Sequence, residues 1–324
     1  MRLATGIAAT LGVAIAALAA SAPQAQPAKQ LSIATGGTGG VYYPLGGGFG
    51  NILGKAIPGV TATAQVTGGS VDNLRLIGSG KADIAFSQVD AAWDAVSGLD
   101  KFSNGKLAIQ ALAVLYPNHM HVVSVESTGI TSVAGMKGKR VSVGATGSAT
   151  EVFANRVLEA AGLDPMKDVR RERLSVAESA NAVKDGKIEA FFWVGGLPTA
   201  AVTDLAATPN TTIRMIDFAD LTAKMNAKYG PLYSETVIPK ETYKGMKADN
   251  NNNAVWNILA VNASMSPDLA YQITKTLFDK IDDLGLVHAE GRNIKFDKQS
   301  LKNAGIPFHP GALKYFAEKG VKIE

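Results

Sequence analysis

The sequence predicts an α/β protein of two lobes, in which parallel-rich sheets are flanked by helices and a ligand cleft lies between the lobes. Apolar runs of strand length alternate with amphipathic helical stretches, a pattern typical of β-α-β units in parallel sheets. The 324 residues are enough for two such lobes, each with a core of its own. A polar tract at 247–253 precedes a late apolar strand, and we expect the chain to return there to the first lobe.

The first part of the chain predicts three short strands, each followed by a helix. Their apolar runs are of strand length and are bounded by glycine or by polar residues. The expected elements are strands at 31–34, 60–67 and 82–88, helices ending near 57, starting at about 70 and containing residue 93, and a long apolar passage at 107–125.

The middle of the chain repeats the pattern and predicts the second lobe. Strand-like runs again alternate with helical stretches. The expected elements are strands at 139–144, 188–196 and 212–217, and helices at about 149–161, 177–184 and 198–207.

The last part of the chain predicts a buried strand at 255–261 and a long helix from Pro267 through Leu284. Ser266 is a suitable N-cap for that helix, and proline is favoured at its first position. We therefore expect residues 31–124 together with 240–324 to form lobe 1, and residues 125–239 to form lobe 2. Two crossings between lobes imply a hinge.

The N-terminal 25 residues predict a secretory signal peptide. Arg2 precedes an apolar run at 4–20, and small residues follow before a polar stretch. A membrane anchor is the alternative, but the run is rich in alanine and glycine rather than leucine. The chain has no cysteine, which excludes disulfides and the acylated cysteine of lipoproteins. We expect a free protein of the periplasm.

Four turns from strand to helix predict the ligand site. In open parallel sheets, ligands bind beyond the carboxyl ends of the strands, at helix N-termini, where backbone N–H groups and the helix dipole favour an anion. The glycine-rich first turn would let those N–H groups approach a carboxylate closely. Taken one at a time, such turns are ordinary capping chemistry. The turns are 36–43, 67–73, 87–90 and 144–151.

Other classes of site are not supported by the motifs. Gly48 to Lys55 lacks the Walker A spacing, and Tyr42 stands where a dinucleotide-binding turn needs its third glycine. His119 and His121 are close-set, but no carboxylate cluster accompanies them, so we expect no metal. Asp90 is expected to be solvated or to cap a helix. The net charge of +4 is too weak to predict nucleic-acid binding, and we expect no cofactor and no catalytic residue.

Three stretches of the sequence together resemble the TAXI family of TRAP-transporter solute receptors. They are TGGTGGVYYPLGG at 35–47, GGSVDNLRLIGSGKADIAFSQVDAA at 68–92 and VSVGATGSATEVFANRVLEAAGL at 141–163. The resemblance implies a two-lobed type II periplasmic binding-protein fold and a receptor, not an enzyme. Such a receptor delivers a small carboxylate or amino acid, such as glutamate, glutamine or 2-oxoglutarate, to TRAP membrane permease subunits driven by an ion gradient.

The resemblance also implies a set of ligand contacts. The second lobe departs from the family pattern at Ala145, Thr146 and Ala149, which weakens the assignment there. Trp193 is added because it ends an apolar strand, where it either forms a wall of the cleft or fills the second core. Of Tyr42 and Tyr43, one is expected to pack and the other to border the ligand. The expected ligand-binding residues are Thr38, Gly39, Gly40, Tyr43, Ser70, Asn73, Gln88, Ser148, Thr150 and Trp193.

Three other functions fit the same sequence. The first is a type II binding protein of an ABC importer of the sulfonate, nitrate or pyrimidine type, with a small anion as the expected ligand. The second is a hydrolase or transferase on a similar two-lobed scaffold, although no nucleophile, base and metal set is recognisable. The third is a ligand sensor that presents its closed form to a kinase.

Overall fold

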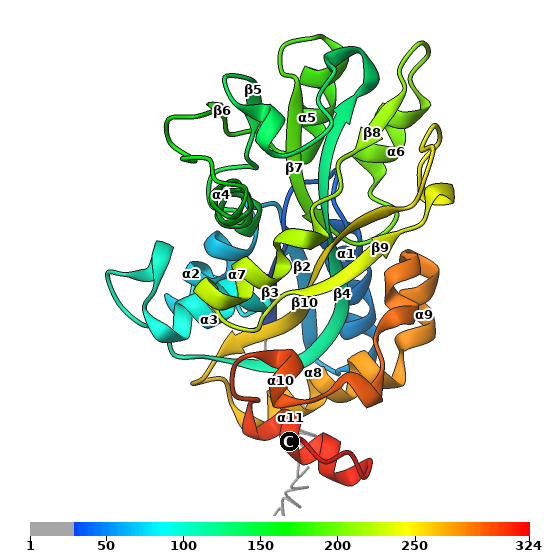
Figure 1. The fold of residues 1–324 in the computed structure, drawn as a ribbon. Helices are drawn as coiled ribbons and strands as arrows, with labels where there is room; N and C mark the ends of the chain where they lie inside the picture. Colours follow the sequence, from blue (N-terminus) through cyan, green and yellow to red (C-terminus); the bar gives the residue numbers. More distant parts are fainter. Residues whose placement is uncertain (1–28) are drawn as a thin grey trace, which may run out of the picture.

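The computed structural model describes residues 29–324, which form two lobes joined by two long strands (Figure 1). The predicted fold class is confirmed: a mixed α/β fold in which a central sheet is flanked by helices. The predicted signal peptide, residues 1–25, lies outside the described residues. Within residues 29–324, no helix is both long enough and apolar enough to span a bilayer.

The strands form one mixed sheet that runs through both lobes. Its order is β2-β1-β3-β10-β4-β7-β5-β6, while β8 pairs with β4 and β9 pairs with β10. The strands are β1 (Lys29–Ala34), β2 (Val60–Gln65), β3 (Ile84–Gln88), β4 (Ile109–Val125), β5 (Arg140–Ser142), β6 (Arg170–Glu172), β7 (Ala190–Gly195), β8 (Ile213–Met215), β9 (Ser234–Ile238) and β10 (Asn250–Asn262).

Helices pack against the sheet in both lobes. In Figure 1, α4, α5 and α6 belong to the upper lobe, whereas α1, α2, α3 and the C-terminal helices belong to the lower lobe. The α-helices are α1 (Tyr42–Ala56), α2 (Ser70–Gly78), α3 (Val89–Ser97), α4 (Ala149–Ala160), α5 (Val176–Lys184), α6 (Ala200–Ala207), α7 (Thr222–Tyr229), α8 (Pro267–Asp279), α9 (Ile281–Val287), α10 (Leu301–Ala304) and α11 (Pro310–Glu318).

The parallel strand pairs follow the predicted β-α-β units. In lobe 1, β1 lies parallel to both β2 and β3, and in lobe 2, β5 lies parallel to both β6 and β7. Leu31 and Ile33 of β1 are fully buried, because helices cover the sheet around them. All three strand-to-helix connections of lobe 1 therefore deliver their helix N-termini to the same edge of the sheet.

The two crossings between the lobes lie inside β4 and β10. The first part of β4 pairs with β10 of lobe 1, whereas 119–124 pairs with β7 of lobe 2. Likewise, 250–254 of β10 pairs with β9, and 257–261 pairs with β3. The expected lobe boundaries at 124/125 and 239/240 stay a prediction. The strands β4 and β10 exchange pairing partners of one lobe for those of the other near residues 118 and 255.

The polar composition of 247–253 suggested a loop, but only part of this tract is one. Asn250 to Asn253 already belong to β10, and Asn252 and Asn253 are fully buried. Several of their side-chain atoms are hydrogen-bonded inside the protein: the amide of Asn250 donates to Asp217 at 2.7 Å, and the side-chain oxygen of Asn253 accepts from the hydroxyl of Thr222. Among residues 29–324, Oδ1 of Asn252 has no donor. Hydrogen bonding therefore allows a run of asparagines to form a buried strand.

The predicted long C-terminal helix is divided in two. Ser266 caps α8 as expected, because its hydroxyl accepts from the N–H of Leu269. The helix ends at Asp279, since Lys280 has φ −120° and ψ 27°, and α9 starts at Ile281. The prediction of one helix through Leu284 was therefore wrong.

Candidate ligand site

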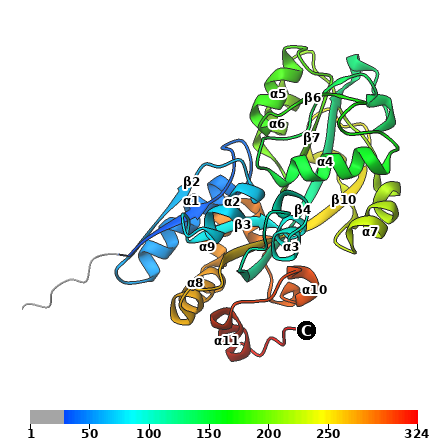
Figure 2. The same ribbon diagram turned by 90° about the vertical axis from the view of Figure 1, so that its left-hand side faces the viewer.

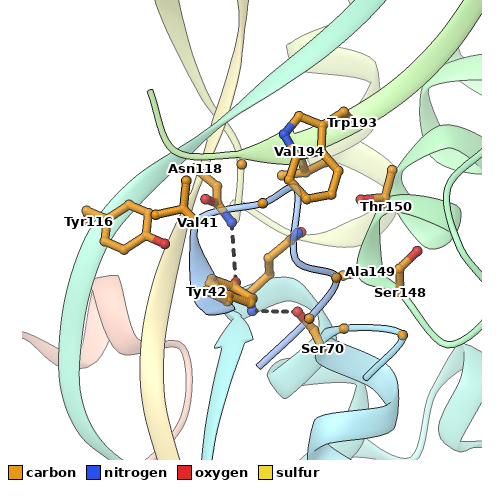
Figure 3. Close-up of a pocket in the computed structure, with 17 residues that line it drawn as sticks. Val41, Tyr42, Ser70, Tyr116, Asn118, Ser148, Ala149, Thr150, Trp193 and Val194 are labelled. Atoms are coloured by element: carbon orange, nitrogen blue, oxygen red, sulfur yellow. Dashed lines mark hydrogen bonds between the residues drawn. The ribbon is translucent and has the colours of Figure 1, made fainter. Parts of the chain in front are cut away.

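A small cavity lies between the two lobes, at the place where the glycine-rich turns meet (Figure 3). Its volume is about 40 Å³. The lining comes from both lobes: Gly36, Gly37, Gly40, Val41, Tyr42, Gly68, Gly69, Ser70, Gln88, Tyr116, Asn118, Ser148, Ala149, Thr150, Trp193, Val194 and Gly195.

The first wall is the turn between β1 and α1. The N–H of Gly40 donates to the carbonyl of Gly37 at 3.1 Å, which closes the turn. A Cβ on Gly40 would lie 2.9 Å from a ring carbon of Trp193, so the two lobes contact each other here as closely as glycine permits. Helix α1 starts behind this turn, and no side chain caps it at Val41. Its first N–H groups are therefore free of a side-chain acceptor.

The second wall is the start of α2. Its N-cap is Gly69, which has φ 123° and no side chain to accept from the helix. The hydroxyl of Ser70 accepts from the backbone N–H of Gln88 at 3.1 Å and ties this helix to the end of β3. Helices α1 and α2 thus both begin at the cavity without a side-chain cap, an arrangement that favours an anion at their N-termini.

The third wall is the start of α4 in the other lobe. Ser148 caps the helix, with its hydroxyl accepting from the N–H of Glu151 at 3.2 Å and donating to the carbonyl of Ala145 at 2.6 Å. Thr150 is buried beside it. The N-termini of three helices, two from lobe 1 and one from lobe 2, therefore converge on the cavity.

The remaining walls are side chains of β4 and β7. Tyr116 and Asn118 lie on β4, and Trp193 lies on β7 (Figure 3). The indole N–H of Trp193 donates to the hydroxyl of Thr199 at 2.9 Å, which fixes the ring over the cavity. Of the two roles open for Trp193, the structure supports the wall of the cleft.

The lining of the cavity is uncharged as far as residues 29–324 are concerned: none of those that line it is Asp, Glu, Lys, Arg or His. Burial raises the pKa of Tyr42 and of Tyr116 well above the ordinary phenol value, so both phenols are neutral at pH 7. The main electrostatic contribution is then that of the helix N-termini, which is positive.

The lobes are in contact around the cavity, so the structure is a closed form. The N–H of Asp72 on α2 donates to the carbonyl of Gly147 before α4 at 3.0 Å. On another side, the N–H of Leu197 in lobe 2 donates to the carboxylate of Glu290 at 2.6 Å. These hydrogen bonds would break if the lobes rotated away from each other, with β4 and β10 as the hinge.

A buried ion cluster also joins the lobes. Arg156 of α4 bonds to Asp94 of α3 at 2.6 Å, and the hydroxyl of Tyr233 donates to Asp90 at 2.9 Å while accepting from Arg156 at 2.7 Å. Figure 2 shows α4 lying on the side of its lobe that faces α3. The expectation that Asp90 is solvated or caps a helix was incomplete, because Asp90 is fully buried and lies 3.7 Å from Arg156.

The structure brings six of the ten predicted site residues to the cavity. They come from all four predicted turns and from β7: Gly40, Ser70, Gln88, Ser148, Thr150 and Trp193. Thr38, Gly39, Tyr43 and Asn73 do not line it.

The four others have different surroundings. Thr38 is exposed, and Gly39 packs against lobe 2, where a Cβ would lie 3.1 Å from that of Ala177. Asn73 is fully buried, but its amide donates to the backbone carbonyls of Thr35 and Phe86, at 2.5 and 2.8 Å, and so ties β1 to β3. Of the tyrosine pair, Tyr42 rather than Tyr43 borders the cavity.

The sequence analysis missed Tyr116 and Asn118. Both lie within the long apolar passage at 107–125. The available signal was the polar stretch Asn118 to His121, which interrupts a passage that is otherwise mostly apolar. Buried polar side chains need hydrogen-bond partners, so such a residue indicates either a polar network or a ligand.

The two close-set histidines lie on β4. His121 is buried and bonds to the hydroxyl of Tyr243 and to the carbonyl of His119, both at 2.9 Å. Within the described part of the chain, no three His, Cys, Asp or Glu side chains are grouped so as to hold a metal ion.

Known proteins share this fold. A sequence model of the NMT1-like family matches residues 33–320. One similar solved structure, described as a periplasmic transporter, has 13% identity and a TM-score of 0.53 over 90% of this chain and 93% of the other. A Bordetella bronchiseptica protein has 18% identity and a TM-score of 0.52 over 89% and 88%. A binding protein component of an ABC phosphonate transporter from Pseudomonas aeruginosa has 11% identity and a TM-score of 0.51 over 82% and 80%. At these identities the likeness concerns the fold.

Proposed function

The chain belongs to the NMT1-like family, and we propose that it is the solute-binding component of an importer, which takes a small acid between its two lobes in the periplasm. The observation that carries this proposal is the convergence of three helix N-termini on one cavity between the lobes, to which residues 29–324 contribute no charged side chain. Backbone N–H groups and hydroxyls can satisfy a carboxylate or a similar anion there without burying a countercharge.

The lining supports binding rather than catalysis. Ser70, Ser148 and Thr150 supply the aliphatic hydroxyls at the cavity, and within residues 29–324 no histidine, lysine or carboxylate lies beside them on its walls to act as a general base. The hydroxyl of Ser148 is also occupied in capping α4. A bound solute would therefore leave unchanged.

The mechanism follows from the contacts between the lobes. In an open form, the starts of α1 and α2 would take up the acid from solution. Closure about β4 and β10 would then bring the Ser148 turn and Trp193 over it, forming the contact between Asp72 and Gly147. The membrane component of the importer would recognise this closed form.

Two classes of importer are candidates. The similarity in fold to the binding component of an ABC phosphonate transporter favours an ABC importer. The motifs at 35–47, 68–92 and 141–163 favour a TRAP permease, because they resemble TAXI receptors. The neighbouring genes distinguish these classes: an ATPase beside a permease supports the first, and a fused multi-span permease supports the second.

A thermal-shift screen of small acids tests the function itself. A solute that binds only the folded chain stabilises it by about 2.7 kcal/mol at one hundred times its Kd. We expect at least one small carboxylate, sulfonate or phosphonate to raise the melting temperature, while its uncharged amide or ester does not. No shift with any anion of the screen would contradict the proposal.

A further inference from the structure

We infer that the solute carries a hydrogen-bond donor, a hydroxyl or amino group, close to its acid group, and that Asn118 accepts a hydrogen bond from it. This inference rests on the proposed function, since it assumes that a small acid occupies the cavity. It names the chemical class of that acid, and it comes from the hydrogen-bond directions of three side chains on the cavity wall and behind it.

The orientation of Asn257 is fixed by the backbone. Its amide nitrogen donates to the carbonyl of Tyr116 at 3.0 Å, and a carbonyl can only accept. The side-chain oxygen of Asn257 must then point the other way. It accepts there from the hydroxyl of Tyr42 and from the amide nitrogen of Asn118, the latter at 2.6 Å.

The orientation of Asn118 follows from that of Asn257. If the amide of Asn118 were reversed, its oxygen would lie against the oxygen of Asn257, and two acceptors would face each other. The nitrogen of Asn118 is also 3.3 Å from the hydroxyl oxygen of Tyr42, which accepts its second hydrogen. Both hydrogens of the amide are therefore used inside the protein.

The described residues leave the side-chain oxygen of Asn118 without a donor. Asn118 is 1% exposed and lines the cavity, and no donor from residues 29–324 reaches its Oδ1. A buried acceptor without a partner is costly, because it has lost its hydrogen bonds to water and gained none in return. A solute that donates a hydrogen bond to this oxygen removes that cost, and a solute that presents another acceptor does not.

The neighbouring polar atoms do not reverse this preference. The hydroxyl of Tyr116 is buried without a partner, but a neutral phenol both donates and accepts. The Oε1 atom of Gln88 is buried and has no donor among residues 29–324, but this amide can turn to present its nitrogen instead, so Gln88 can accept or donate. Asn118 on β4 thus offers an oxygen that can only accept, while the helix N-termini offer donors. An acid whose second polar group is a donor complements both.

Two matched series of acids test this inference on the unaltered chain. Lactate, pyruvate and alanine share a three-carbon skeleton and present a hydroxyl, a carbonyl or an ammonium group at the same carbon. A second series has a five-carbon skeleton and carries the same three groups at the carbon next to one carboxylate: 2-hydroxyglutarate, 2-oxoglutarate and glutamate. In whichever series binds, titration calorimetry should show the hydroxy or amino acid binding at least about tenfold more tightly than the oxo acid.

An Asn118→Ala variant tests the residue. It removes the acceptor, so the preference for the donor-bearing acid should fall to within about threefold. Asn252→Ala is the matched control, because Asn252 is also buried, also has an Oδ1 without a partner, and does not line the cavity. This control should keep the full preference. The unaltered chain gives a result even if a variant fails to fold.

The outcomes separate the inference from the function on which it rests. If the oxo acids bind as tightly as their partners, or if Asn118→Ala keeps the preference, the inference is overturned while a small-acid receptor stands. If no member of either series binds but other anions do, the inference that the solute is a carboxylate with a hydrogen-bond donor is overturned as well. If no anion binds at all, the proposed function fails as well.

Discussion

Arg156 of α4 and Asp94 of α3 form a buried ion pair between the two lobes, with 2.6 Å from Nη2 to Oδ2. Both side chains are nearly fully buried, at 4% and 6% exposure, and Asp90 lies behind them. A buried charge is tolerated in a protein only with its partners present, because desolvation disfavours it strongly. The pair therefore couples the contact between the lobes to the stability of the chain.

Replacing Arg156 should destabilise the protein severely. In Arg156→Met, Asp90 and Asp94 lose their cation, and we expect the free energy of unfolding to fall by about 3–5 kcal/mol in urea titrations. Lys167→Met is the control, because the ion pair of Lys167 with Asp164 is at the surface and its loss should cost no more than about 1 kcal/mol. A loss for Arg156→Met as small as that of the control would show that the cluster is not important for stability.

Gly147→Ala should hold the lobes apart. Gly147 has φ 80°, and a Cβ there would lie 2.2 Å from the carboxylate of Asp72 in the other lobe. We expect a larger radius of gyration by small-angle scattering and at least about tenfold weaker solute binding, because closure is blocked.

Gly162→Ala provides the control for this steric effect. Gly162 has a similar φ of 84°, but no atom lies within 4 Å of its Cβ position. The backbone strain is thus matched, and only the contact with the other lobe differs. Equal radii of gyration for the two variants would contradict the assignment of this contact to closure.

Acid should destabilise the protein through His119 and His121. Burial lowers the pKa of His119 to about 4 and that of His121 to about 3, below the ordinary value of 6.5. At a pH between the folded-state pKa of each histidine and 6.5, the unfolded chain binds more protons than the folded chain. The free energy of unfolding therefore falls as the pH falls from 6.5. Over 1.5 pH units each histidine can account for about 2 kcal/mol.

His121→Gln isolates one of these contributions. The variant removes the titrating ring but keeps a polar side chain that can reach Tyr243, the hydrogen-bond partner of His121. The difference in unfolding free energy between the two proteins should stay constant from pH 7 to 8 and should shrink as the pH falls to 5. A constant difference across the whole range would show that His121 does not titrate as its burial requires.

The fold could be predicted from the sequence because local pattern and tertiary structure agree. The apolar runs that became β1, β3 and β7 are bounded by glycine and polar residues, and each is buried as its pattern requires. The asparagines at 250–253 were different, because their burial depends on partners such as Asp217 and Thr222 that are distant in sequence. Composition cannot identify such partners.

The site could be predicted only at the level of its turns. Helix N-termini at strand ends were visible as glycine turns, and Ser70 and Ser148 do lie at the cavity. Which of Tyr42 and Tyr43 faces inward depends on the residue at which α1 begins, since neighbouring helical residues point about 100° apart. Asn118 lies on a strand that crosses between the lobes, and only its pairing with β10 brings it to Asn257.

The most direct measurement compares the tightest-binding acid with its own primary amide by titration calorimetry on the folded chain. The two molecules have nearly the same shape, and they differ in the negative charge that the starts of α1, α2 and α4 are proposed to hold. We expect the amide to bind at least about tenfold more weakly. Equal affinity for the two would contradict the account, because helix N-termini would then make no contribution to solute capture.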